Sequence, residues 1–341
     1  MRALVTVGGR YVGAAEPFTV DSPWWNHVEP VTRHLDRVLG VTTSVLRLVS
    51  TSTAGAHGGV VTYQVEADRV PARGLSAAER HEFPDHPSRL PWARPGGPAA
   101  LVEWAMGYVE PTGPAVQVKT WNLSCLYRLP TTRGTVWVKA TPPFGADEDG
   151  IIGMVASVDP SLVPTVIAAE PGRVLLDEAP GVDCWQPADE VIERIVPAWV
   201  AVQAALAGEP RARVLGVRLP DFGLPDTLLH GDFHPGNWRS SGVVLDWGQA
   251  HWGHPALDAG RLIGFAAPEH GPAIERAWVR EWLRHYPSSD PVGALRHGRP
   301  ASHRLGALIY QEFLDRIEPS ERVYHLGDPE EELERAQSFA V

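Results

Sequence analysis

The stretch that most constrains this chain is HGDFHPGN at residues 230–237, which is followed by VVLDWG at residues 243–248. Three of its side chains carry oxygen donors, namely Asp232, Asn237 and Asp246. Such donors are the ligands that Mg²⁺ prefers in proteins. A carboxylate can also accept the proton of an attacking hydroxyl group. The residue types therefore indicate a phosphoryl-transfer site.

The spacing of the two motifs predicts a β-hairpin. Residues 240–242 read Ser-Ser-Gly between two short apolar runs, and a three-residue loop that ends in Gly closes a hairpin. In that hairpin Asn237 lies near Leu245 and therefore beside Asp246. One Mg²⁺ ion can then contact both side chains while substrate phosphates fill its other positions. Asp232 lies on the loop that enters the hairpin, where its carboxylate is placed to accept a proton.

A known family shares this pattern. An Asp followed five residues later by an Asn, and then a strand that ends in Asp-x-Gly, is the pairing of catalytic loop and metal loop found in kinases. The version His-Gly-Asp-x-His-x-x-Asn, with Leu-Asp-Trp behind it, resembles the aminoglycoside phosphotransferase and choline kinase family of small-molecule kinases. The resemblance implies that Asp232 is the catalytic base and that Asn237 and Asp246 bind Mg²⁺. It also implies ATP as phosphoryl donor and a small-molecule hydroxyl group as acceptor.

Two residues upstream of the motifs are expected to orient the nucleotide. Lys139 lies in the strand sequence Val-Trp-Val-Lys, and a strand lysine of this kind can pair with the α- and β-phosphates of ATP. Glu148 precedes Ile151, Ile152 and Val155 at helical spacing, so it shares their inward face on the predicted helix. We therefore expect Glu148 to orient Lys139.

Two further segments take their roles from the resemblance alone. The turn with Asn122 and Ser124 corresponds to the loop that covers the nucleotide phosphates, although a glycine-rich sequence is missing there. Asp177, Glu178 and Ala179 correspond to the hinge, whose backbone groups bind the adenine edge. Both segments are therefore expected to contact the nucleotide.

The resemblance also assigns supporting roles around the base. Asp258 corresponds to an acidic position that buttresses the catalytic loop without reacting. His230 and His234 flank Asp232 and are expected to hold the loop by hydrogen bonds rather than to transfer protons. Gly231 stands where regulated protein kinases place an arginine, which favours an unregulated small-molecule kinase.

The fold class that we predict is α+β: a bilobal protein-kinase-like fold with a small β-rich N-lobe and a helical C-lobe, preceded by a small α/β module. The expected domains are an N-terminal cap module at residues 1–70, a proline-rich connector and helix at 71–115, the N-lobe at 116–180 and the C-lobe at 181–341. The C-lobe is expected to include a helix near residues 302–317.

The N-terminal module is expected to contain one helix. Asp21-Ser22-Pro23 is typical of a helix start with Pro just inside. Apolar residues then repeat at helical spacing at Trp24, Val28, Val31, Leu35 and Val38. This pattern predicts a helix whose apolar stripe begins with Trp24.

Composition limits the possible classes of protein. The chain of 341 residues is 44% hydrophobic and can bury a sizeable core. It has no run of about 18 apolar residues, so no membrane span is expected. The formal charge of −11 disfavours nucleic acid as a partner. Two cysteines argue against a disulfide framework, and the N-terminus lacks the apolar core of a signal peptide, so a cytoplasmic location is expected.

The sequence leaves alternative functions open. The chain can be a catalytically inactive kinase fold that binds nucleotide, or a kinase that acts on proteins or on fructosamine-type glycated lysines. It can also be a metal hydrolase in which His230, Asp232, His234 and Asp246 hold a transition metal. The acceptor is equally open among aminoglycosides and other antibiotics, sugars and amino alcohols. Candidate acceptor contacts are Asp183, His251, Trp252 and Glu312.

Overall fold

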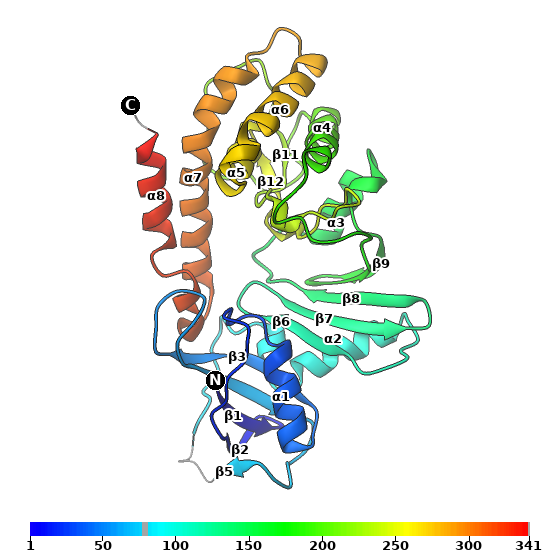
Figure 1. Ribbon diagram of the computed structural model, residues 1–341, viewed down its shortest axis with the longest axis vertical. Coiled ribbons are helices and arrows are strands. Elements are labelled where there is room, and N and C mark those ends of the chain that lie inside the picture. Colours follow the sequence, from blue (N-terminus) through cyan, green and yellow to red (C-terminus); the bar gives the residue numbers. More distant parts are fainter. Residues whose placement is uncertain (77–80, 340–341) are drawn as a thin grey trace. The chain divides into compact units, whose positions relative to one another are not determined.

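The computed structural model describes residues 1–76 and 81–339, and the chain divides into two compact units (Figure 1). Unit 1 comprises Met1–Pro142, Val166–Asp177 and Glu312–Leu326. Unit 2 comprises Pro143–Thr165, Glu178–Gln311 and Gly327–Val341. Unit 1 contains both five-stranded sheets, and unit 2 is mainly helical. The predicted α+β class is therefore confirmed, whereas the predicted domain boundaries stay a prediction.

The first sheet of unit 1 has the strand order β3-β4-β1-β2-β5, in which only β1 and β4 pair in parallel. Its strands are β1 (Arg2–Val7), β2 (Arg10–Ala15), β3 (Thr43–Thr51), β4 (Val61–Ala67) and β5 (Leu75–Ser76). Helix α1 (Glu29–Leu39) buries Val31 and Leu35 in one core with Val45 and Val65 of the sheet. Val45 and Val65 are β-branched and suit a pleated surface that is buried on one side.

The second sheet of unit 1 is antiparallel throughout, with the order β6-β7-β8-β10-β9. Its strands are β6 (Val116–Thr120), β7 (Cys125–Thr131), β8 (Gly134–Ala140), β9 (Val166–Glu170) and β10 (Arg173–Asp177). Helix α2 (Gly97–Met106) buries Leu101 and Ala105 in a core with Leu129 and Val138. The strand that is predicted to carry Lys139 is confirmed as β8.

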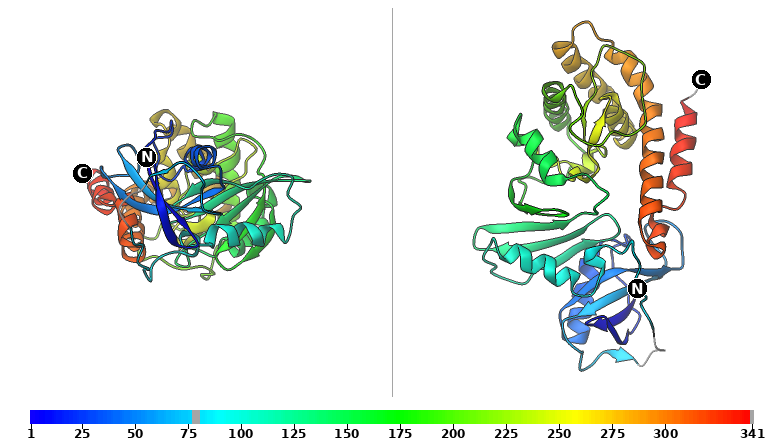
Figure 2. Two further views of the ribbon diagram at one scale, coloured as in Figure 1. Left: turned by 90° about the horizontal axis from the view of Figure 1, so that it is seen from below. Right: turned by 180° about the vertical axis from the view of Figure 1, so that it is seen from behind.

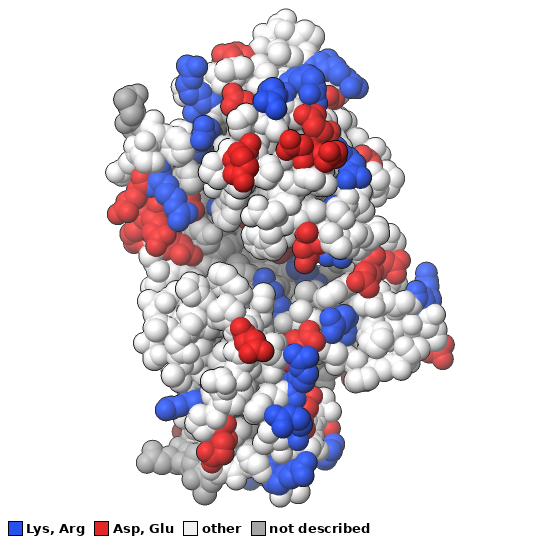
Figure 3. Space-filling view, viewed as in Figure 1, with Lys and Arg blue, Asp and Glu red and all other residues white. Residues whose placement is uncertain are grey.

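Unit 2 places its helices around a short two-stranded sheet. The helices are α3 (Glu148–Ala156), α4 (Asp189–Leu206), α5 (Ala256–Phe265), α6 (Gly271–His285), α7 (Pro291–Arg316, of which the last five residues belong to unit 1) and α8 (Asp328–Ser338). The strands are β11 (Thr227–Leu229) and β12 (His251–Gly253). Helices α7 and α8 lie side by side (Figure 2), and the carboxylates of α8 form the red cluster at the left of Figure 3. No helix of the described residues is long and apolar enough to cross a lipid bilayer.

The predicted start of the N-terminal helix is wrong. Helix α1 begins at Glu29, with Pro30 in its first turn, and the preceding segment is irregular. Trp24 is 46% exposed, whereas its neighbour Trp25 is fully buried and donates from Nε1 to the Gly58 carbonyl oxygen over 2.7 Å. The apolar stripe of α1 therefore begins with Val28 and not with Trp24. Burial of Trp25 and its hydrogen bond to Gly58 hold the preceding segment outside the helix.

The predicted start of the helix near residue 302 is also wrong, because α7 begins at Pro291 and runs through Pro300. A proline interrupts one helical hydrogen bond, but packing can offset that cost. Gly298 lies against α5 so closely that a Cβ atom there would collide with the Ala256 carbonyl oxygen. This close contact between α5 and α7 stabilises the first turns of α7, where the sequence pattern predicts no helix because of Pro300.

Unit 1 contains a cluster of buried charges. Glu318 pairs with Arg47 over 3.4 Å and with Arg89 over 2.9 Å, and all three side chains are at most 8% exposed. Glu321 lies in the following short helix and accepts a hydrogen bond of 2.8 Å from the Leu48 backbone N–H. Burial raises the pKa of Glu321 to about 8, although the Leu48 N–H and the two arginines oppose that shift.

This pKa predicts a pH-dependent stability. The folded state keeps the Glu321 proton up to about pH 8, whereas the unfolded chain releases it near pH 4.5. The free energy of unfolding therefore decreases as the pH rises from about 4.5 to about 8. Glu321→Gln should remove this loss and make the protein more stable than the wild type by about 2 kcal/mol at alkaline pH, with a smaller difference in mild acid. Urea unfolding at both pH values measures the difference, and exposed Glu103→Gln is the control. An equal pH dependence in wild type and Glu321→Gln would contradict the assignment.

Candidate active site

The predicted catalytic loop, residues 230–237, follows β11 and leads into the hairpin, and one buried carboxylate fixes it. Asp258 on α5 is 3% exposed, and it accepts hydrogen bonds from the backbone N–H groups of His230 (2.8 Å) and Gly231 (3.0 Å). The Trp199 indole donates to the same carboxylate over 3.0 Å. Gly231 has φ +84°, and a Cβ atom there would collide with the Gln249 backbone, so only Gly fits the turn. The expected buttress role of Asp258 is therefore supported directly by geometry.

The predicted hairpin is confirmed. The Arg239 N–H donates to the Val243 carbonyl oxygen, and the Leu245 N–H donates to the Asn237 carbonyl oxygen, both over 2.8 Å. The pairing therefore places Asn237 opposite Leu245 and next to Asp246, which is the register that the three-residue loop predicts.

The predicted metal loop, residues 246–248, has an unusual backbone. Asp246 has φ 65° and ψ 62°, and it is the one residue other than Gly with positive φ among residues 1–76 and 81–339. A left-handed backbone costs an ordinary residue about 1–2 kcal/mol, and such residues cluster at functional sites. Glu148 at the start of α3 accepts a hydrogen bond of 3.1 Å from the N–H of Trp247. Glu148, which is predicted to lie on the inward face of the helix, therefore holds the backbone next to Asp246 through this hydrogen bond.

The two carboxyl oxygens of Asp232 have different partners. Oδ1 accepts from Arg261 Nη2 at 2.9 Å and from Nε at 3.2 Å. Oδ2 has longer contacts of 3.4 Å with Asn237 Nδ2 and with His234 Nε2. Burial alone would raise the pKa of Asp232, but the Arg261 charge and the His234 N–H outweigh burial and hold the pKa well below its ordinary range. Asp232 is therefore an ionised carboxylate at neutral pH.

The two loop histidines act as hydrogen-bonding supports, as predicted. His230 accepts at Nδ1 from the Asp232 N–H (3.2 Å), and its Nε2 lies 2.9 Å from the Leu245 carbonyl oxygen. His234 accepts at Nδ1 from the Gly236 N–H over 3.0 Å, so its proton is on Nε2, which faces Asp232. Burial lowers the pKa of His230 to about 4, which keeps the ring neutral.

Arg261 is a site residue that sequence analysis missed. It lies on α5, three residues after Asp258, and the two are the only charged residues in that helix. A lone arginine one turn from a predicted buttress, in an otherwise apolar helix, was the available signal. Without the fold, however, nothing in the sequence indicates that its guanidinium reaches Asp232.

Four of the predicted nucleotide contacts belong to unit 1. Lys139 is buried on β8, between Leu126 and Val174 of the neighbouring strands. The side chain of Asn122 is taken up inside the unit, because Oδ1 lies 3.1 Å from His325 Nε2 and Nδ2 donates to the Glu321 carbonyl oxygen. The nucleotide roles of Lys139 and Asn122 therefore stay predictions, and Asn122 would have to break two hydrogen bonds to fulfil its role.

The remaining predicted nucleotide contacts also stay predictions. The Ser124 hydroxyl accepts a hydrogen bond of 3.0 Å from the Trp121 indole. The chain passes from unit 1 to unit 2 between Asp177 and Glu178, within the predicted hinge. The Ala179 carbonyl oxygen accepts a weak hydrogen bond of 3.4 Å from Arg239.

Two of the suggested acceptor contacts are wrong. His251 and Trp252 are each 1% exposed, and the Trp252 indole donates to the Gly208 carbonyl oxygen over 3.2 Å. Both side chains are packed into the core because β12 pairs with β11 beneath the catalytic loop. Asp183 is exposed and forms an ion pair with Arg239, whereas Glu312 belongs to unit 1.

The donor set of the site fits Mg²⁺ carried by a nucleotide. Nδ2 of Asn237 donates to the Asp232 carbonyl oxygen over 2.9 Å, which leaves Oδ1 as the acceptor atom of the amide. Among the described residues no group of three or more His, Cys, Asp or Glu side chains is arranged to hold a metal ion. Both ring nitrogens of His230 have hydrogen-bond partners in the protein, namely the Asp232 N–H and the Leu245 carbonyl oxygen. The arrangement therefore suits an ion that takes two oxygen ligands from the protein and others from phosphates, and it disagrees with the metal-hydrolase alternative.

Comparison with known proteins supports the resemblance. Residues 159–292 match the model of the phosphotransferase enzyme family. The match includes the catalytic loop, the hairpin, Asp258 and Arg261, so the family that the motifs indicated is confirmed for this segment. No protein of curated function matches the chain at a significant level of similarity.

Several solved structures are similar to this chain at low identity. A choline/ethanolamine kinase family protein from Mesorhizobium loti is 15% identical, with 71% of this chain and 94% of that chain covered and a TM-score of 0.48. Choline kinase LicA from Streptococcus pneumoniae is 14% identical, with 71% and 99% covered and a TM-score of 0.48. Because both TM-scores are below 0.5, the assignment rests on the family match and on the geometry of the site.

A buried histidine just before α5 predicts that the fold becomes less stable in acid. His254 accepts at Nδ1 from the Ala256 N–H over 3.2 Å, and burial lowers its pKa to about 4. Between about pH 4 and pH 6.5 the unfolded chain binds a proton at residue 254 that the folded state does not bind. The free energy of unfolding is therefore highest above about pH 6.5 and decreases as the pH falls towards 4. His254→Asn keeps an acceptor near Nδ1 and should reduce this acid loss by about 2 kcal/mol. Urea unfolding across the interval, with exposed His297→Asn as control, measures the effect. An unchanged acid dependence in His254→Asn would contradict this account.

Proposed function

We propose that this chain, whose residues 159–292 match the phosphotransferase enzyme family, is an ATP-dependent kinase that phosphorylates a hydroxyl group of a small molecule. One observation carries the proposal. The hairpin register sets Asn237 beside Asp246, and the Asn237 amide in turn donates to the backbone of Asp232. One amide and two carboxylates of a short stretch of chain therefore lie close together, as phosphoryl transfer requires.

The residues have distinct proposed roles. Asn237 and Asp246 would hold Mg²⁺, which supplies charge neutralisation at the phosphates of ATP when it is bound. Asp232 orients the acceptor hydroxyl and takes its proton. Lys139 binds the phosphates and Glu148 orients it. Glu148 also steadies the metal loop through the Trp247 N–H.

The hinge and the phosphate loop complete the proposed nucleotide site. The backbone of Asp177, Glu178 and Ala179 would bind the adenine edge, and the turn with Asn122 and Ser124 would cover the phosphates. Both roles follow the family resemblance and rest on no contact of the described structure.

The low basicity of Asp232 agrees with this reaction. In phosphoryl transfer the transition state is loose, so positioning and electrostatic stabilisation contribute more than proton abstraction. A carboxylate whose pKa lies below its ordinary range is ionised at neutral pH and can orient a hydroxyl group there. It accepts the proton late, when the bond to phosphorus is largely formed.

The acceptor class is defined by a substrate panel. Purified protein with Mg²⁺ and ATP is offered aminoglycosides, macrolides, sugars, amino alcohols and glycated lysine, and ADP release is followed with a coupled assay. We expect one class of hydroxyl compound to raise ADP release well above the rate with water alone. Nucleotide binding without turnover on any member would favour the inactive nucleotide-binding alternative.

Substitution of the two carboxylates separates their roles. Asp232→Asn should lower kcat by about 10²–10⁴-fold, because the group that orients and deprotonates the hydroxyl is lost. Its affinity for ATP, measured by calorimetry, should stay within a few-fold of the wild type. Asp246→Asn should instead weaken binding of ATP in the presence of Mg²⁺.

The control for both substitutions is Asp226→Asn, which changes an exposed carboxylate just before β11. It should keep wild-type kcat and ATP affinity. Wild-type turnover in the Asp232→Asn protein would refute the assigned base. Equal binding of ATP with and without Mg²⁺ in the wild type would refute the metal role.

A further inference from the structure

Arg261 determines which oxygen of Asp232 is available. Its Nε and Nη2 atoms both donate to Oδ1, at 3.2 and 2.9 Å. Within the described part of the chain, Oδ2 has only the two longer contacts of 3.4 Å, to Asn237 and His234. Because two donors on one oxygen fix the rotation of a carboxylate, Oδ2 is the atom left to face an acceptor hydroxyl.

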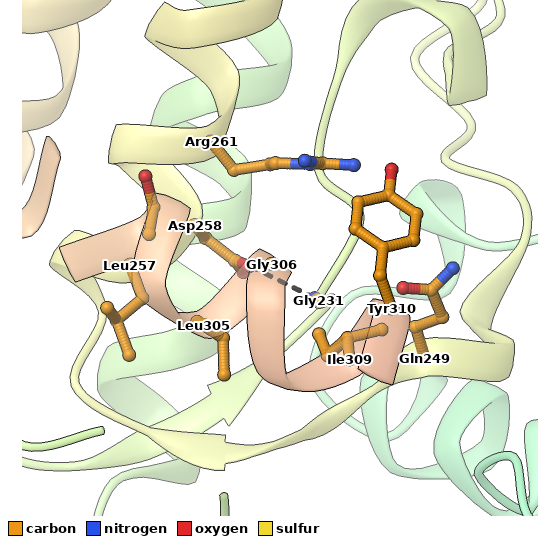
Figure 4. Close-up of a pocket in the computed structure, with 10 residues that line it drawn as sticks. Gly231, Gln249, Leu257, Asp258, Arg261, Leu305, Gly306, Ile309 and Tyr310 are labelled. Atoms are coloured by element: carbon orange, nitrogen blue, oxygen red, sulfur yellow. Dashed lines mark hydrogen bonds between the residues drawn. The ribbon is translucent and has the colours of Figure 1, made fainter. Parts of the chain in front are cut away.

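Arg261 is itself held on three sides. Its guanidinium lies 4.2 Å from the centre of the Phe265 ring, one turn further along α5. It is hydrogen-bonded to the Tyr310 hydroxyl on α7. Figure 4 shows the guanidinium and that hydroxyl side by side, with Asp258 turned towards Gly231; all four residues line one small cavity. The third contact is Glu332 on α8, at 3.7 Å.

Glu332 differs from the other acidic residues of α8. Glu330, Glu331 and Glu334 are exposed, whereas the Glu332 side chain is 4% exposed. It accepts from His303 Nδ1 on α7 over 2.7 Å, and its Oε1 lies 3.3 Å from Arg335 on α8 and 3.7 Å from Arg261 on α5. A carboxylate is buried at a high cost unless positive groups compensate it. Glu332 therefore links α8 both to His303 on α7 and to the arginine beside the base.

The packing of α5 against α7 holds this arrangement in register. Gly260 precedes Arg261, and a Cβ atom on it would lie 2.7 Å from the Gly298 carbonyl oxygen. The two helices thus touch through their backbones at this point. Such a contact leaves little freedom for Arg261 to slide relative to Tyr310.

We propose that Arg261 is a positioning residue for the Asp232 carboxylate, and that the C-terminal helix α8 is part of the catalytic apparatus because Glu332 holds Arg261 in place. The inference rests on the proposed kinase function. The guanidinium turns Oδ2 towards the acceptor, and α8 supplies the negative charge that keeps the guanidinium from turning away.

The test compares Arg261→Ala, Arg261→Lys and Glu332→Gln with Arg280→Ala. Arg280 forms an exposed pair with Glu193 over 2.7 Å on another helix and is the matched control. The probe is Mg²⁺ and ATP with water as acceptor, so that no acceptor need be known. Arg261→Ala should lower kcat for ADP release about 100-fold while KM for ATP changes little, because misplacement of a catalytic group by about 1 Å has this effect.

The other variants give graded results. Arg261→Lys keeps the charge but loses the fork of donors, so its kcat should be intermediate. Glu332→Gln should lower kcat about tenfold, as loss of a supporting contact does elsewhere. Added guanidine should restore part of the activity of Arg261→Ala, which a purely structural role of Arg261 would not allow. The double variant Arg261→Ala/Glu332→Gln should be no slower than Arg261→Ala, since Glu332 acts through Arg261.

Three results would overturn the proposal. The first is wild-type kcat in Arg261→Ala. The second is a loss of kcat that guanidine does not restore and that a matching loss of thermal stability or ATP affinity accompanies. The third is a wild-type protein that neither binds nor hydrolyses ATP, while hydrogen exchange of residues 230–238 rises in Arg261→Ala and not in Arg280→Ala. In that case the kinase function fails and Arg261 supports only the fold of the loop.

Discussion

The hydrogen bonds that Asp258 accepts from the catalytic-loop backbone are the constraint on which the site depends. A buried carboxylate that accepts N–H groups from His230 and Gly231 fixes the point at which the chain leaves β11. The turn is possible because residue 231 is Gly. Only a few residues separate Gly231 from the hairpin, so the hydrogen bonds to Asp258 also fix the positions of Asp232 and Asn237.

Charge compensation then extends outward from the anchor. Asp232 is buried enough to need a positive partner, and Arg261 on the anchoring helix provides it. Arg261 in turn is compensated by Glu332. Negative and positive groups alternate from the catalytic loop to the C-terminal helix, and each is buried at acceptable cost only because its neighbours are present.

Local sequence was sufficient to predict the parts of the site that are close in the chain. The Ser-Ser-Gly loop predicted the register of the hairpin, and the family resemblance identified Asp258. Arg261, Tyr310 and Glu332 meet only through the packing of three helices, and no periodicity connects them. The wrong start of α1 has a similar cause, because burial of Trp25 is a tertiary contact that outweighs a local helix signal.

The most direct test of the account is a crystal structure of the protein with Mg²⁺ and a non-hydrolysable ATP analogue. The account predicts one metal ion about 2.1 Å from Asn237 Oδ1 and from a carboxyl oxygen of Asp246, with the γ-phosphate facing Asp232. A nucleotide bound elsewhere, or a metal ion held by other residues, would contradict the assignment of this loop as a phosphoryl-transfer site.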